Sequence, residues 1–360
     1  MDVDASPPPE GPAALLRAVP AARRRGDLRA ALALAAEAAA LADAQGDAVL
    51  AAEARAQQAL LFARLGDLMP AVEAGQQALG HFTHAGPLAA LAQVSCALSL
   101  AYERAGLQAL AHEHAASALD SARACGDAAA ECNALQRLGL AMDDADGQRR
   151  GLARLEQSLA LARGLADPEL HFMVANNLAR RWVLEADRLA GRGDDPQPAL
   201  HEAQRVAEEA TALAQKAGSP FQQAMAASNL GGVLRRQRDT GAARQAFHRA
   251  LALAQAGGYD GLARTVTLAL QVLAVETAPT RASCAELAEG LGAHAPGADP
   301  DLQRQARRTL VDALRQIGDL AGALHHLERL HADVVAAMTA RIDLVARLAS
   351  DQAGSASASR

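Results

Sequence analysis

The stretch NLGGVLRRQRDTGAARQAFHRALALAQ, from Asn229 to Gln255, predicts two helices joined by a turn. It keeps Gly231, Ala243 and Ala250 small, although a glycine within a helix weakens that helix when it stands alone. Because the distance between packed helices depends on the side chains at their contact, small residues indicate a close approach of two backbones. The stretch therefore predicts a helical hairpin that packs tightly.

The same pattern recurs along most of the chain. Equivalent frames begin at residues 26, 66, 106, 146, 198, 238, 278 and 318, and every step is 40 residues except one of 52. Five and twelve residues after these starts, fifteen of the sixteen residues are Ala, Gly or Ser. We expect alanines of these two columns to pack between helices, among them Ala71, Ala78, Ala111, Ala118, Ala203, Ala210, Ala243, Ala250 and Ala323.

These columns resemble the tetratricopeptide repeat (TPR), whose signature runs W-x₂-L-G-x₂-Y, then A, then x₃-F, then A. NLGGVL followed by Ala243, Phe247 and Ala250 fits these spacings, and the resemblance covers about residues 12–338. It implies an all-α fold: a right-handed α–α superhelix of about eight helix–turn–helix units with a long C-terminal helix. The 40-residue period is longer than the usual 34 and is similar to repeats of bacterial signalling proteins. The turn glycine is replaced by Arg238 in the opening stretch.

The ends and the longer step suggest how the array is organised. We expect residues 1–11 to be disordered, Pro20 to bend or break the first helix, and an insertion at 183–197 to form a surface loop or an elbow. The last helix is expected to continue through 339–350, before a flexible tail at 351–360. Its apolar stripe, which includes Val334, Met338 and Ile342, predicts either a cap on the preceding unit or self-association.

Composition narrows the class of function. The net charge of −6 gives no general attraction to nucleic acid or to an anionic membrane. No signal peptide or membrane-spanning run is visible, and the four cysteines show no metal or disulfide spacing, so we expect a cytoplasmic protein. Asp143, Asp144 and Asp146 form an acidic group, which we interpret as turn residues. We find no catalytic constellation and predict no enzyme activity, no cofactor and no metal.

The TPR resemblance implies that the first helix of each unit lines a concave groove. Carried over to this chain, the inward positions include Glu53 and Gln93 together with apolar, amide and charged residues. Amides can pair with an extended peptide backbone, and arginines with carboxylates. The candidate binding residues are Leu60, Arg64, Leu100, Glu103, Arg104, Asn133, Gln136, Leu140, Asn176, Arg180, Ser228, Arg235, Arg236, Arg308, Asp312 and Arg315.

The resemblance therefore implies a non-enzymatic scaffold or adaptor that binds a protein or peptide in its groove. The alternative is a regulatory sensor of a bacterial signalling system. Similar arrays precede diguanylate cyclase output domains, and here the output domain would act in trans.

Overall fold

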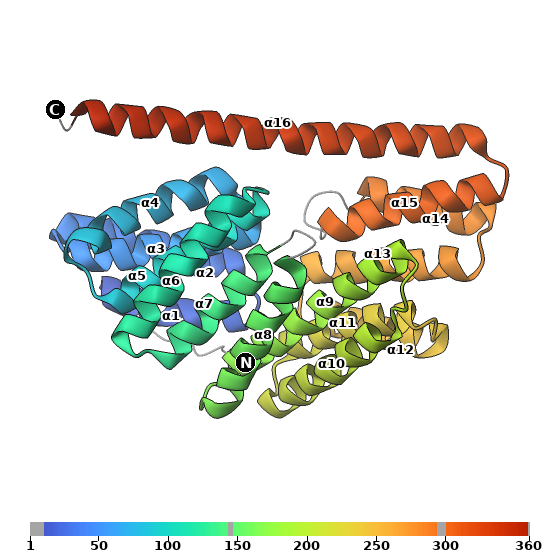
Figure 1. Cartoon of the computed structure of the whole chain (residues 1–360), viewed down its shortest axis with the longest axis horizontal. Coiled ribbons are helices and arrows are strands. Elements are labelled where there is room, and N and C mark those ends of the chain that lie inside the picture. Colours follow the sequence, from blue (N-terminus) through green and yellow to red (C-terminus); the bar gives the residue numbers. More distant parts are fainter. Residues whose placement is uncertain (1–10, 143–146, 294–299, 359–360) are drawn as a thin grey trace, which may run out of the picture. The chain divides into compact units, whose positions relative to one another are not determined.

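The computed structural model describes residues 11–142, 147–293 and 300–358 (Figure 1). Within these ranges the chain forms sixteen α-helices and no strand. The predicted all-α repeat fold is confirmed, and the helices form eight successive pairs. Their bounds are α1 Pro12–Arg24, α2 Leu28–Gln45, α3 Ala48–Leu65, α4 Leu68–Ala85, α5 Leu88–Arg104, α6 Gln108–Cys125, α7 Ala128–Ala141, α8 Gly147–Gly164, α9 Pro168–Arg192, α10 Gln197–Ala217, α11 Pro220–Arg236, α12 Thr240–Ala256, α13 Asp260–Thr277, α14 Arg281–Ala293, α15 Pro300–Gln316 and α16 Leu320–Ala358.

The chain divides into two compact units, residues 1–181 and 182–360. Within the first unit, neighbouring helices from α1 to α8 pack in sequence order, and within the second the same holds from α10 to α16. The boundary falls inside α9, which at 25 residues is longer than any helix before it. The predicted insertion therefore lengthens this helix by about two turns and ends at the turn around Gly193.

The turns follow a short local code. Gly46 ends α2 with a left-handed backbone, φ 72°, and the next residue, Asp47, accepts a hydrogen bond from the Leu50 amide at 3.0 Å to cap α3. A left-handed C-cap followed by an aspartate N-cap satisfies backbone groups that helix ends would otherwise leave unpaired. The same Gly-Asp pair joins α6 to α7 at Gly126 and Asp127. These turns are thus determined by residues within a few positions of them.

Arg238 occupies the glycine position of the turn between α11 and α12. Its φ is 64°, the only positive value found at a residue other than glycine in the described chain. A side chain in this region costs about 1–2 kcal/mol, so the turn imposes a glycine-like conformation on an arginine.

Replacing Arg238 by glycine should therefore stabilise the protein. Removing the strain outweighs the extra freedom that glycine adds to the unfolded chain, and we expect a net gain of about 0.5–1 kcal/mol. Urea denaturation measures this gain. The matched control, Arg244→Gly inside α12, should instead lower stability by about 1 kcal/mol; a loss with both variants would argue against strain at Arg238.

The small columns lie at helix contacts. A Cβ atom at Gly231 would sit 2.7 Å from Cδ1 of Phe247, so the aromatic ring of α12 rests directly on the backbone of α11. Ala243 and Ala250, on the same helix as Phe247, are fully buried. The other alanines of the two columns are buried as well: Ala71, Ala78, Ala111, Ala118, Ala203, Ala210 and Ala323.

The first helix differs from its prediction. Pro20 lies inside α1, and the helix continues through it to Arg24. Proline removes one backbone hydrogen bond, but Val19 and Ala22 on either side of it are fully buried. Packing against α2 and α3 therefore holds the helix together across the proline. The expected disorder of residues 1–11 lies outside the described residues except for Gly11.

The last helix also differs from its prediction. α16 continues to Ala358, beyond residue 350, because its final segment contains alanine and serine but no proline that would stop it. Its stripe does not form a cap: Val334, Met338 and Ile342 are 41%, 60% and 65% exposed. All described residues from 331 to 343 are exposed, so this part of α16 extends beyond α15 without a covering helix.

Candidate functional site

The candidate groove residues fall into three classes of exposure. Leu100, Gln136, Asn176 and Arg235 are buried; Leu60, Arg64, Glu103, Leu140, Ser228 and Arg236 are half-buried; Arg104, Asn133, Arg180, Arg308, Asp312 and Arg315 are exposed.

In the second unit, two consecutive arginines at the end of α11 bind carboxylates of the same chain. Arg235 donates from Nη1 to Oε1 of Glu276 at 2.5 Å. Arg236 donates from Nε and Nη2 to the two carboxylate oxygens of Asp187, each at 2.8 Å. These two candidate ligand contacts are therefore engaged in joining α11 to α13 and α9.

The burial of Arg235 affects its ion pair with Glu276. The Arg235 side chain is 5% exposed, and burial, followed by the neighbouring Arg236, lowers its pKa, whereas Glu276 opposes this shift. A buried cation of this kind needs its counter-ion, because an unpaired charge away from water is costly. Replacing Arg235 by glutamate would place a second carboxylate beside Glu276, so that variant is unsuitable for probing ligand binding.

Three other candidates come together at the end of the second unit. Arg308, Asp312 and Arg315 of α15 line one side of a groove of about 530 Å³, and the other side is formed by α16. The α16 side is apolar, with Leu320, Leu324, Leu327 and Leu330. The groove thus combines an apolar wall with a charged rim.

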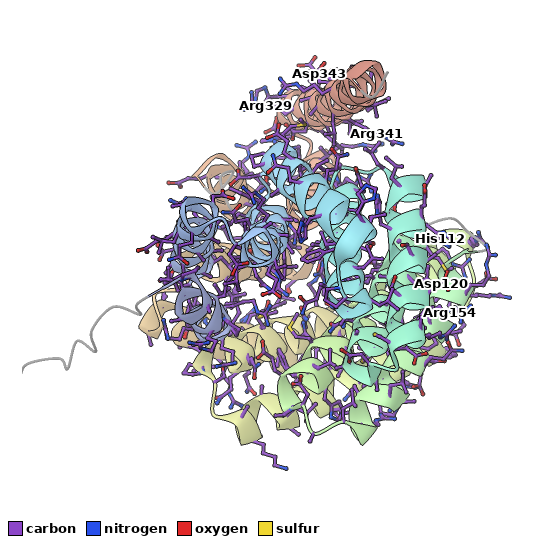
Figure 2. The ribbon with its side chains drawn as sticks, turned by 90° about the vertical axis from the view of Figure 1, so that its left-hand side faces the viewer. His112, Asp120, Arg154, Arg329, Arg341 and Asp343 are labelled. Carbon is purple, nitrogen blue, oxygen red and sulfur yellow. The ribbon has the colours of Figure 1, made fainter. Side chains whose placement is uncertain are left out.

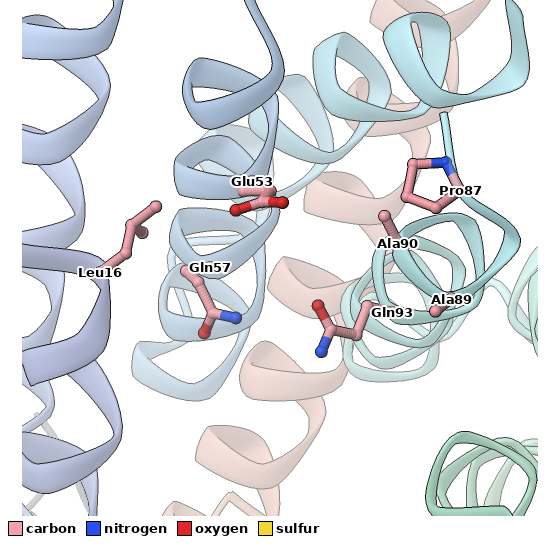
Figure 3. A pocket seen from close by; sticks show the side chains of 7 residues that line it. All are labelled: Leu16, Glu53, Gln57, Pro87, Ala89, Ala90 and Gln93. Atoms are coloured by element: carbon pink, nitrogen blue, oxygen red, sulfur yellow. The ribbon is translucent and has the colours of Figure 1, made fainter. Parts of the chain in front are cut away.

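The first unit contains an open pocket of about 350 Å³ between the first helices of three successive pairs (Figure 3). Gln57 of α3 and Gln93 of α5 point into the same space, and Glu53 lies one turn from Gln57. Glu53 and Gln93 were both predicted to face inward. The remaining lining residues are Leu16, Pro87, Ala89 and Ala90.

Sequence reasoning missed Gln57. Its signal was present, because it follows Glu53 by four residues and therefore shares the same helix face. The 40-residue column alone does not find it, since the equivalent position in the next unit is Ala97. In these long helices, a lining surface includes residues from more than one column of the repeat.

Polar groups deeper in the first unit also contact one another. Arg137 of α7 pairs with Glu103 of α5 at 3.3 Å, and its other terminal nitrogen donates to the side-chain Oε1 of Gln136 at 3.4 Å. The side-chain amide of Asn133 donates a hydrogen bond to the backbone carbonyl of Ala129, in the same helix, at 3.2 Å. The structure therefore brings Glu103 and Gln136 together through an arginine that the sequence had not singled out.

The described part of the chain contains no group of three or more His, Cys, Asp or Glu residues that could hold a metal ion. The acidic residues Asp143, Asp144 and Asp146 lie outside the described residues. None of the described helices is long and apolar enough to cross a membrane. Cys132 is buried against Ser158, where burial raises the pKa of its thiol.

Comparisons with known proteins identify the fold. No protein-family model matches the chain, and no curated protein matches its sequence. A Rap protein in complex with competence and sporulation factor is 12% identical, with a TM-score of 0.65 over 92% of this chain and 100% of that one. The apo form of the quorum sensor NprR from B. thuringiensis is 11% identical, with a TM-score of 0.59 over 88% and 86%. Aspartyl phosphate phosphatase F from Bacillus subtilis is 10% identical, with a TM-score of 0.57 over 83% and 74%.

At these sequence identities the similarity shows a shared fold and does not assign a function to any residue. Both the small-residue columns and the neighbouring structures agree on the architecture. The chain has the fold of a TPR-like helical repeat protein.

Proposed function

We propose that this protein is a non-enzymatic scaffold or adaptor that binds a peptide or an extended protein segment within its first unit. The observation that carries this proposal is the open pocket with two glutamines from neighbouring helices. An amide side chain both donates and accepts, so it can match the alternating N–H and C=O groups of an extended backbone. Gln57 and Gln93 meet this requirement and Glu53 adds an acceptor.

The fold likeness supports the same function class. One of the similar structures is a Rap protein complexed with competence and sporulation factor, and another is a quorum sensor. We infer a role in regulation through ligand binding, in the cytoplasm. The alternative of a sensor that acts on a diguanylate cyclase output domain gains no support from these structures.

A peptide-display experiment tests the proposal. Peptides selected from a random library on the wild-type protein should bind Gln57→Ala/Gln93→Ala with a Kd raised roughly ten- to thirtyfold, since two hydrogen bonds of about 1 kcal/mol each are lost. Fluorescence anisotropy measures the Kd. The control is His112→Ala/Asp120→Ala, at two exposed residues of α6 labelled in Figure 2, and it should bind unchanged. Failure to select any peptide, or equal binding by both variants, would contradict the proposal.

We also propose that α16 mediates self-association. The exposed stripe carries large apolar side chains, and such contiguous surfaces usually mark an interaction site. Spacings of three and four residues suit a seam between two helices. Charged residues lie on the same helix, among them Arg329, Arg341 and Asp343, labelled in Figure 2. A second copy of the chain offers the same combination of stripe and charges.

A further inference from the structure

Arginines recur at one position of the first three helix pairs. Arg24, Arg64 and Arg104 are spaced 40 residues apart, each in the last turn of the first helix or at its end. Arginine in a last turn interacts favourably with the helix dipole, which explains each residue separately. The dipole does not explain why the ends of α1, α3 and α5 lie in one region together with a further arginine, Arg137.

Ion pairs over long distances in sequence create this region. Glu169, in the first turn of α9, lies 3.5 Å from Arg23 and 3.7 Å from Arg24 at the end of α1. Arg137 of α7 is paired with Glu103 of α5. The first unit thus curves until the start of α9 meets the end of α1.

Arg64 lies within this region and has no close partner. It forms no hydrogen bond or ion pair with any residue in the part of the chain that the structure describes, although it interacts electrostatically with Arg23, Arg137 and Glu169. Burial, followed by the charges of Arg23, Arg137 and Arg104, lowers its pKa to about 9, whereas Glu169 opposes the shift. Arg64 still keeps its charge at neutral pH, so its five donors remain available.

Other donors nearby also lack an acceptor. Nε of Arg23 and Nε2 of Gln136 are buried and have no hydrogen-bond partner. Gln136 is held beside Arg137, and Arg23 interacts electrostatically with Arg64. Buried donors in folded proteins are nearly always paired, so these two donors without acceptors, together with the unpartnered Arg64, indicate that an acceptor is missing. The group that fits two or more guanidinium donors is an oxyanion.

We propose that the first unit holds an oxyanion of its ligand, the carboxylate of an acidic peptide, at Arg64, with Arg23 and Gln136 as further donors. The inference rests on the proposed peptide-binding function and specifies the ligand class. Guanidinium groups bind carboxylates and phosphates with paired hydrogen bonds. These hydrogen bonds are stronger where water is excluded. An anion bound here would also offset the cost of keeping Arg64 charged inside the unit.

Thermal unfolding with small anions tests the site without any peptide. We expect acetate and inorganic phosphate, each compared with chloride at equal ionic strength, to raise the Tm of the wild type. At an anion concentration a hundredfold above its Kd, the rise should be roughly 5–10 °C. Arg64→Met should abolish the rise, whereas Arg29→Met, at an exposed residue of α2, should keep it.

The comparison also separates the two sources of an oxyanion. A rise with acetate supports a carboxylate site, and a rise with phosphate alone overturns the acidic-peptide assignment. Arg64→Met should in addition have a higher Tm than the wild type in chloride, because it removes a half-buried charge that has no close partner. An unchanged wild-type Tm in both anions would show that the chain itself neutralises Arg64, and it would overturn the proposal.

A second measurement ties the site to the ligand. For a selected peptide that contains carboxylates, converting them to amides should raise the Kd for the wild type about tenfold and leave the Kd for Arg64→Met unchanged. Equal effects on both proteins would exclude a contact with Arg64. If peptides bind but no anion stabilises, the oxyanion site alone fails; if anions stabilise but no peptide is selected, the peptide function fails.

Discussion

Gly151→Ala is expected to destabilise the first unit by about 1–3 kcal/mol, even though alanine is the better helix former. Gly151 of α8 faces Gly139 of α7 with no side chain between them. A Cβ atom at Gly151 would lie 2.6 Å from the Gly139 carbonyl oxygen, and a Cβ atom at Gly139 would lie 2.7 Å from the Gly151 carbonyl oxygen. Two backbones in direct contact cannot relax by a side-chain rotation, so the helices must separate.

The same unit supplies a matched control. Gly80 lies within α4, and a Cβ atom there would have no heavy atom within 4 Å. Gly80→Ala should therefore stabilise the protein by about 0.5–1 kcal/mol, through helix propensity alone. Urea denaturation followed by circular dichroism measures both changes. Stabilisation by Gly151→Ala as well would show that α7 and α8 do not touch at this point.

Met338→Lys/Ile342→Lys is expected to convert a self-associated protein into a monomer of 37.2 kDa. The two side chains are 60% and 65% exposed in the single chain and lie one turn apart on α16. Burying a large apolar side chain contributes about 1.5–3 kcal/mol, so two lysines in the seam should raise the dissociation constant at least a hundredfold. Light scattering after size-exclusion chromatography measures the mass.

The fold of the single chain should survive this change, because both residues are exposed there. Circular dichroism should show unchanged helix content. The control, Ala332→Lys/Ala336→Lys, adds the same charge with the same spacing on a different face of α16, since each residue advances the helix by about 100°. A wild type that is monomeric at all concentrations would disprove self-association through the stripe.

The repeat architecture could be predicted because its determinants are local. The turn conformation depends on one residue with a left-handed backbone, such as Gly46 or Arg238, and the aspartate that follows caps the next helix. Each hairpin needs a small residue where its own two helices touch, as at Gly231, whose backbone lies against the ring of Phe247. These requirements repeat every 40 residues, so their columns are visible in one sequence.

The candidate site was less predictable, because a groove position does not reveal a side chain's partner. Arg235 and Arg236 were assigned to ligand binding, yet they pair with Glu276 and Asp187, which lie 41 and 49 residues away. Neither partner is adjacent in sequence, and consecutive arginines point to different helices. Which carboxylate each arginine reaches depends on how one helix pair is rotated relative to the next.

The amino-acid sequence by itself determined the helical pairs, their turns and the small contacts within them, because each depends on residues close together in the chain. Only the tertiary structure decided that α9 returns to α1, where Glu169 meets Arg23 across most of the first unit. The curvature that brings them together is the sum of small rotations at every helix contact, and no single column of residues specifies that sum. The environment of Arg64, and with it the proposed oxyanion site, follows from this accumulated rotation.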